Sequence, residues 1–185
     1  VAGLSGLSEK RSLGKGEILR PFLNSPKSDL KIYIDENELA YVEDDTNSNN
    51  NFDRNFLRNE IVPSLETRWS KLSERAAFTS LTAKKKKLSL DFMLEKSFKK
   101  EISSGIIERA DFIEIPSFII EELIRLILRK KGIALPNQKV LSEVMSVFFQ
   151  KKPSNESYVE WSRKDGEQMG GKVFSEHNNI IFKKK

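Results

Sequence analysis

Two arginines and several amide side chains gather between residues 43 and 58, where together they could bind an anion. Arg54 and Arg58 are four residues apart, so on a helix both guanidinium groups project from one face. Asp53 can cap the start of that helix, whose free backbone N–H groups also attract negative charge. A planar guanidinium donates paired hydrogen bonds to a phosphate or a polarised carbonyl. Such a pair would act by electrostatic stabilisation rather than as an acid or base.

The same spacing has a purely structural interpretation. Asp44, Asp45 and Asp53 are close to both arginines in the sequence and could pair with them, which would fasten a loop to the helix. Exposed ion pairs are common in proteins and contribute little to function or stability. On spacing alone, both interpretations stay open.

Lysines supply a second candidate interface. Lys84 to Lys87 are consecutive and could follow a phosphate backbone, although a solvated helix face explains them equally well. Residues 1–60 carry 8 Lys+Arg and 11 Asp+Glu, whereas residues 61–185 carry 24 and 16, which gives the net charge of +5. A basic second part favours a polyanionic partner. Lys183 to Lys185 are expected to be a frayed end.

Composition excludes several classes of site. The chain has no cysteine, so disulfides, thiolate nucleophiles and Cys-based zinc sites are ruled out, and His177 is its single histidine. No apolar run reaches the length of a membrane span, and the start does not have the pattern of a signal peptide. We therefore expect a cytoplasmic protein without a membrane partner. Because the chain does not start with Met, we expect it to begin inside a larger protein.

The elements around the candidate site follow from local signals. Glycines predict a loop in the first twenty residues, followed by a short strand in 17–23 and a helix capped by Ser25 with Pro26 in its first turn. Residues 40–42 read as a brief strand, and the Asn-rich stretch 43–51 reads as a loop. A helix then starts at Asp53, with a kink near Val62 caused by Pro63.

The second part reads as mostly helical. Residues 65–100 keep a helical pattern, 102–116 are less regular, and 117–131 form the clearest helix, ended by Gly132. A further helix runs from 136 to about 150. A strand at 158–161 and a hairpin at 172–182 follow. The fold class is α+β and mostly helical: the C-terminal end of an α/β domain in residues 1–60, then a helical domain in 61–185 with a small terminal β-hairpin.

The same stretches resemble the tRNA(Ile)-lysidine synthases. That family carries E-D-x-[ST]-N, a few polar residues, F-x-R-N-x-x-R, a Pro and often R-W. Further upstream it has G-L-x-G-[ML] and then L-R-P-L-L. This chain has the matching runs in the same order: Gly3–Leu7, Leu19–Leu23, Glu43–Asn47, Phe52–Arg58, Pro63 and Arg68-Trp69. The helices from Leu126 to Leu141 match more weakly.

The resemblance implies a PP-loop ATP pyrophosphatase fold for residues 1–60 and a tRNA-binding or linker domain for 61–185. It implies a ligase that uses ATP to adenylate the wobble cytidine of tRNA(Ile) with a CAU anticodon, after which L-lysine displaces AMP. Arg54 and Arg58 would support catalysis electrostatically. Asn47, Asn55, Lys84 and Lys85 would touch tRNA. The resemblance also implies that ATP and Mg²⁺ are held by an N-terminal part absent from this chain, and that the whole protein can form a homodimer.

The chain departs from the family pattern in one respect. It has neither the Ser-Gly-Gly-x-Asp-Ser loop nor the His-x-x-Asp-Asp segment, since Gly170-Gly171 precedes Lys172 and His177 precedes Asn178. We therefore expect a downstream fragment that lacks the PP-loop and has no cofactor or metal site and no activity by itself. The alternative is a non-catalytic, basic helical RNA-binding or scaffolding module. The sequence upstream of Val1 would distinguish the two.

Overall fold

The computed structural model describes residues 2–13, 16–162 and 169–185. The chain divides into two compact units, Val1–Lys87 and Leu88–Lys185, and the division falls inside one long helix, α4 (Leu72–Ser97). The sequence predicts domains at residues 1–60 and 61–185. These bounds come from the family resemblance and not from the packing of the chain, and they stay a prediction.

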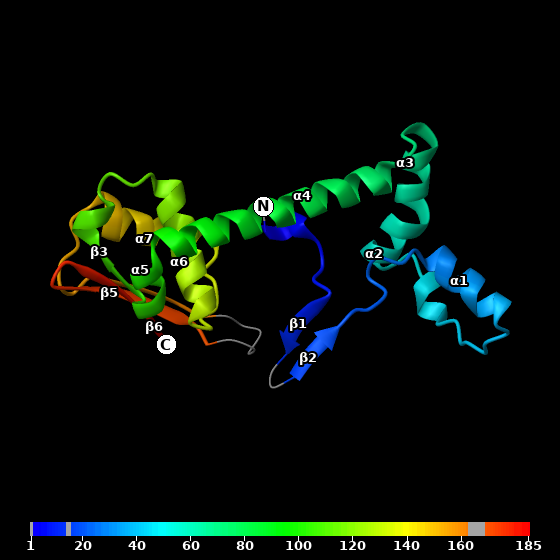
Figure 1. The fold of residues 1–185 in the computed structure, drawn as a ribbon, viewed down its shortest axis with the longest axis horizontal. Helices are drawn as coiled ribbons and strands as arrows, with labels where there is room; N and C mark the ends of the chain where they lie inside the picture. The colour runs from blue at the N-terminus through cyan, green and yellow to red at the C-terminus, as the bar shows by residue number, and fades with distance from the viewer. Residues whose placement is uncertain (1, 14–15, 163–168) are drawn as a thin grey trace. The chain divides into compact units, whose positions relative to one another are not determined.

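The first unit begins with an antiparallel hairpin and continues with short helices (Figure 1). Lys10 lies opposite Leu19 in the hairpin, so part of the loop predicted for the first twenty residues is a strand instead. The elements of this unit, before α4, are η1 (Ala2–Ser5), β1 (Lys10–Leu13), β2 (Gly16–Leu19), α1 (Lys27–Glu36), η2 (Asp45–Ser48), α2 (Asp53–Phe56), η3 (Leu57–Ile61) and α3 (Val62–Arg68).

Two further predictions for the first unit are wrong. Residues 40–42 form no strand in the described chain, because no neighbouring strand pairs with them, and Val42 is 93% exposed. The predicted cap Ser25 lies outside the helix: α1 starts at Lys27, with Pro26 at the capping position and no side-chain capping bond. Pro26 has an extended backbone, which places the start of the helix one residue later than the Ser-Pro pattern suggests.

The helix that follows the Asn-rich loop continues through Val62, so the kink or break predicted there takes the form of a π-helical segment just before Pro63. The segment η3, between α2 and α3, is a π-helix, in which the N–H of Val62 donates to the carbonyl of Leu57, five residues back. Proline has no N–H to donate and its ring crowds the preceding turn, so the ladder widens just before it. Arg58 lies in this widened segment.

The second unit pairs helices with a small antiparallel sheet. In its described part the strand order is β3-β6-β5-β4. The elements after α4 are α5 (Lys99–Ser104), β3 (Ile106–Glu108), η4 (Arg109–Phe112), α6 (Ser117–Lys130), α7 (Gln138–Met145), η5 (Ser146–Gln150), β4 (Tyr158–Trp161), β5 (Gly171–Glu176) and β6 (Asn179–Lys184). The mixed, mostly helical α+β class predicted from the sequence is confirmed.

The predicted terminal hairpin is β5–β6, at the centre of that sheet. His177 and Asn178 form its turn with φ of 48° and 66°, the left-handed pair that suits a tight hairpin. Lys183 and Lys184 belong to β6, so the expectation of a frayed end is wrong for them. Pairing with Lys172 and Gly171 of β5 holds these residues in place.

The core of the second unit lies between α6, α7 and one face of the sheet. Leu123, Ile127 and Phe148 are fully buried, and Trp161 donates from its indole Nε1 to the carbonyl of Ala134 at 2.6 Å. Gly171 must be glycine, because an added Cβ would come within 2.3 Å of the Trp161 ring. Gly132 ends α6 with φ of 63°, as predicted.

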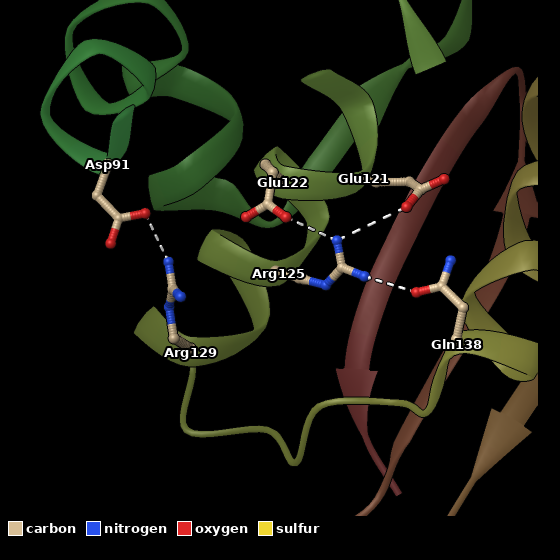
Figure 2. A network of polar contacts seen from close by, with 6 residues as sticks. All are labelled: Asp91, Glu121, Glu122, Arg125, Arg129 and Gln138. Atoms are coloured by element: carbon tan, nitrogen blue, oxygen red, sulfur yellow. Dashed lines mark hydrogen bonds and ion pairs between the residues drawn. The ribbon is translucent and has the colours of Figure 1, made fainter. Parts of the chain in front are cut away.

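Polar contacts on the partly exposed side of α6 fasten it to its neighbours (Figure 2). Arg125 donates to Glu122 at 2.8 Å and to Gln138 of α7 at 3.0 Å, and lies 3.6 Å from Glu121. Arg129 pairs with Asp91 of α4 at 2.7 Å. The C-terminal half of α4 therefore belongs structurally with α6. Across the described residues, none of the helices is long and apolar enough to cross a membrane.

Candidate functional site

The loop before α2 is organised by its own side chains. Asp44 caps the short helix η2, because its Oδ1 accepts from the backbone N–H of Thr46 at 2.9 Å and from the Thr46 hydroxyl at 2.7 Å. The hydroxyl bond, followed by the backbone bond, holds the pKa of Asp44 below its ordinary value. Asp44 is thus an ionised carboxylate whose hydrogen bonds serve the loop.

Asn55 joins this loop to the helix. Its side chain is 8% exposed, and its Nδ2 donates to the carbonyls of Thr46 at 2.8 Å and Asn49 at 3.0 Å. A buried amide that spans two turns of a loop fixes the path of the backbone. The predicted tRNA contact of Asn55 stays a prediction, and the structure adds a positioning role for it.

Asn59 is a second fastening residue, which the sequence analysis missed. Its Nδ2 donates to the carbonyl of Asn47 at 3.3 Å and to the side chain of Asn50 at 2.9 Å, while Asn50 donates to Glu60 at 3.0 Å. Its spacing could have indicated this role, because Asn59 follows Asn55 by four residues, just as Arg58 follows Arg54, and so lies on the same side of a helix.

Arg54 and Arg58 are the positions adjacent to these two asparagines, and both side chains are exposed. Throughout the described residues, neither guanidinium makes a hydrogen bond or ion pair, so the pairing with Asp44 or Asp53 that a structural role would require is not present. The side chain of Asp45 lies outside the described part. The asparagines therefore hold the loop, and the electrostatic role predicted for Arg54 and Arg58 stays a prediction.

The remaining predicted site residues lie in two places. Asn47 is exposed in η2 of the same loop, next to the residue whose carbonyl Asn55 holds. Lys84 and Lys85 lie on α4, with Lys84 half-buried and Lys85 exposed. The structure thus brings Asn47, Arg54, Asn55 and Arg58 together, and the lysines belong to another element.

Two upstream motif residues have structural roles. Gly6 has φ of 68°, and an added Cβ would lie 2.8 Å from the Ser80 hydroxyl of α4, so a larger residue would strain the chain and crowd the helix. Arg20 donates from Nη1 to the carbonyl of Ser8 at 3.0 Å, which ties the end of β2 to the segment before β1. These contacts account for a glycine and an arginine at these positions.

Comparison with known proteins matches both the motif stretch and the second unit. Residues 1–65 match the PP-loop domain family. The tRNA(Ile)-lysidine synthase of Coxiella burnetii is 33% identical over 144 residues, which cover 78% of this chain and 32% of that protein. The tRNA(Ile)-lysidine synthase of Buchnera aphidicola subsp. Schizaphis graminum is 31% identical over 164 residues, covering 85% and 36%.

A third relative matches over a shorter stretch. The tRNA(Ile)-lysidine synthase of Serratia proteamaculans is 36% identical over 93 residues, half of this chain and 21% of that protein. The chain spans about a third of the length of the first two relatives, with 32% and 36% of them covered. The chain is therefore similar to tRNA(Ile)-lysidine synthases over about a third of their length, and its residues 1–65 match a PP-loop domain.

Proposed function

We propose that this chain is part of an ATP-dependent ligase that joins L-lysine to the wobble cytidine of tRNA(Ile) with a CAU anticodon, through an adenylated tRNA intermediate. We also propose that this enzyme acts in the cytoplasm and assembles as a homodimer. The similarity to tRNA(Ile)-lysidine synthases supports the reaction class, and the loop geometry supports the part that we propose for this chain.

One observation supports this role above the others. Within the described residues, Arg54 and Arg58 make no ion pair, and they lie beside a loop that Asn55 and Asn59 hold in place. Adenylation and lysine transfer both develop negative charge on phosphate or on the displaced group. Two guanidinium groups carried on a helix start that the loop contacts fix can stabilise that charge electrostatically. Arg54 and Arg58 would take this electrostatic role, and the exposed Asn47 would contact tRNA at the edge of the same loop.

ATP and Mg²⁺ do not fit the residues of this chain on their own. Among the described residues, no group of three His, Asp or Glu side chains is arranged to hold a metal ion. The sequence also has no Ser-Gly-Gly-x-Asp-Ser loop to hold phosphates. We therefore propose that another part of the ligase holds ATP and Mg²⁺.

The test of this function is ATP-dependent incorporation of labelled lysine into a tRNA(Ile) transcript. We expect a longer protein that contains this chain and a Ser-Gly-Gly-x-Asp-Ser loop to modify the CAU transcript and to spare one whose wobble cytidine is replaced by uridine. We expect the 185-residue chain alone to incorporate none. Incorporation by the chain alone, or none by the longer protein with a correct transcript, would contradict the proposal.

Lys84 and Lys85 of α4 are proposed to contact tRNA phosphates. Replacing both by glutamine should weaken tRNA binding by the chain and lower the slope of log K against log salt by about two, one for each lost phosphate contact. Filter binding across a salt series measures that slope. The matched control is Lys99→Gln with Lys100→Gln on α5, which removes the same charge; equal slopes for both double variants would assign the effect to net charge alone.

A further inference from the structure

One face of the C-terminal sheet carries a row of apolar side chains that the core does not use. Along β5 and β6 the residues alternate, with Val173, Ile180 and Phe182 buried against the helices. Their neighbours point to the other face, as the pleat of a strand requires. The strand register places four of these in one row across the sheet: Ile106 opposite Ile181, Ile181 opposite Phe174, and Phe174 opposite Tyr158.

This outer row, here called the aromatic row (Ile106, Ile181, Phe174 and Tyr158), is open to solvent at its ends. Tyr158 is 58% exposed and Ile106 is 39% exposed, while Phe174 and Ile181 are half-buried between their neighbours. Two adjacent rings on a flat sheet offer a surface on which planar groups can stack.

Lysines border the aromatic row on one side. The next row of the same face holds Lys183 opposite Lys172. The Nζ of Lys172 lies 4.4 Å from the centre of the Tyr158 ring, and that of Lys183 lies 5.2 Å from the centre of the Phe174 ring. The same row also holds Glu160, opposite Lys172, and Glu160 forms an ion pair with Lys185 at 3.0 Å. Each ring therefore has a lysine ammonium group over it, and this flexible side chain moves aside when a planar group stacks on that ring.

The opposite border of the aromatic row is acidic. Glu108 and Glu176 belong to the row that pairs through Asn179, on the far side of the rings from Lys172 and Lys183. A chain of phosphates would be attracted to the lysine border and repelled from the glutamate border. The face is thus polarised: it has stacking surfaces in the middle and positive charge along one edge.

We propose that this face binds unpaired nucleotides of an RNA, with bases stacked on Tyr158 and Phe174 and phosphates beside Lys172 and Lys183. Base–aromatic stacking with lysines at the backbone is the chemistry by which open sheets hold single-stranded RNA. The face is a further RNA contact of the chain, separate from the arginine loop and from Lys84 and Lys85. That the RNA is tRNA rests on the function proposed above; the stacking itself does not.

The test measures the affinity of the 185-residue chain for a short fluorescein-labelled oligouridine by anisotropy. Tyr158→Leu and Phe174→Leu keep an apolar side chain and lose the ring, so each should weaken binding by about fivefold or more. Phe174→Tyr keeps the ring and should bind like the parent chain. Lys172→Gln and Lys183→Gln should each lower the salt slope by about one.

Matched controls distinguish stacking on this face from the loss of any exposed ring or any positive charge. Phe118→Leu removes an exposed ring on α6 and Lys139→Gln an exposed charge on α7; neither should change the affinity. A duplex of the same length should compete weakly, because its bases are already stacked. Equal affinity of the ring variants and the parent, or equal competition by the duplex, would overturn this proposal and leave the lysine-incorporation test untouched, since that test measures a different reaction.

Discussion

A longer ligase that contains this chain is expected to lose about a hundredfold in kcat/KM for tRNA when Arg54 or Arg58 becomes alanine, the scale of removing one preorganised charge-stabilising donor. Each guanidinium is exposed and unpaired within the described residues, so its removal should leave the melting temperature nearly unchanged. Lysine incorporation under single-turnover conditions gives the rate, and thermal melting of the same preparations gives the stability.

Two comparisons make this result specific. Arg75→Ala removes an exposed arginine from α4 and should change neither rate nor stability. Asn55→Ala should instead lower the free energy of unfolding by about 1–3 kcal/mol, because two loop carbonyls lose their buried donor. If the arginine variants melt early and keep normal activity per folded molecule, the arginines serve the fold, and the electrostatic role is wrong.

Phe148→Ala is expected to lower the free energy of unfolding of the second unit by about 3–5 kcal/mol. Phe148 lies in η5 and its ring is fully buried in the core cluster, so the lost ring leaves a cavity that its neighbours cannot fill easily. Urea denaturation of the chain, followed by circular dichroism, measures this change.

The control for that result is the same substitution at an exposed ring. Phe118 is 66% exposed at the start of α6, and Phe118→Ala should cost no more than about 0.5 kcal/mol. Similar losses at the two positions would mean that the buried cluster around Phe148 is not the part of the chain that unfolds cooperatively.

Local signals predicted the second unit well. The helix at 117–131 has an apolar stripe at helical spacing and a glycine at its end, and α6 runs from Ser117 to Lys130. Asn137 caps α7 through its side chain, which accepts from the N–H of Val140. The turn at His177 and Asn178 needs two left-handed residues, and polar residues in this position indicate it directly. Each of these features depends on a few neighbouring residues.

Features that depend on distant partners were not predictable in the same way. Strand β3 has three residues and exists because β6 pairs with it. The sequence shows Asn55 as a candidate for RNA contact and does not single out Asn59, and only the path of the loop reveals that both amides hold backbone carbonyls. Trp69 and Trp161 look alike in sequence, yet Trp161 is 7% exposed and Trp69 is 49% exposed.

The helix α4 has a thermodynamic consequence for the whole chain. Its 26 residues form one hydrogen-bonded ladder about 39 Å long, and the boundary between the two compact units falls inside it. The unfavourable nucleation of a helix occurs once for the entire ladder. Folding of either unit therefore lowers the entropic cost of ordering the other unit's half of α4, and so the melting transitions of the two units are coupled through a shared backbone.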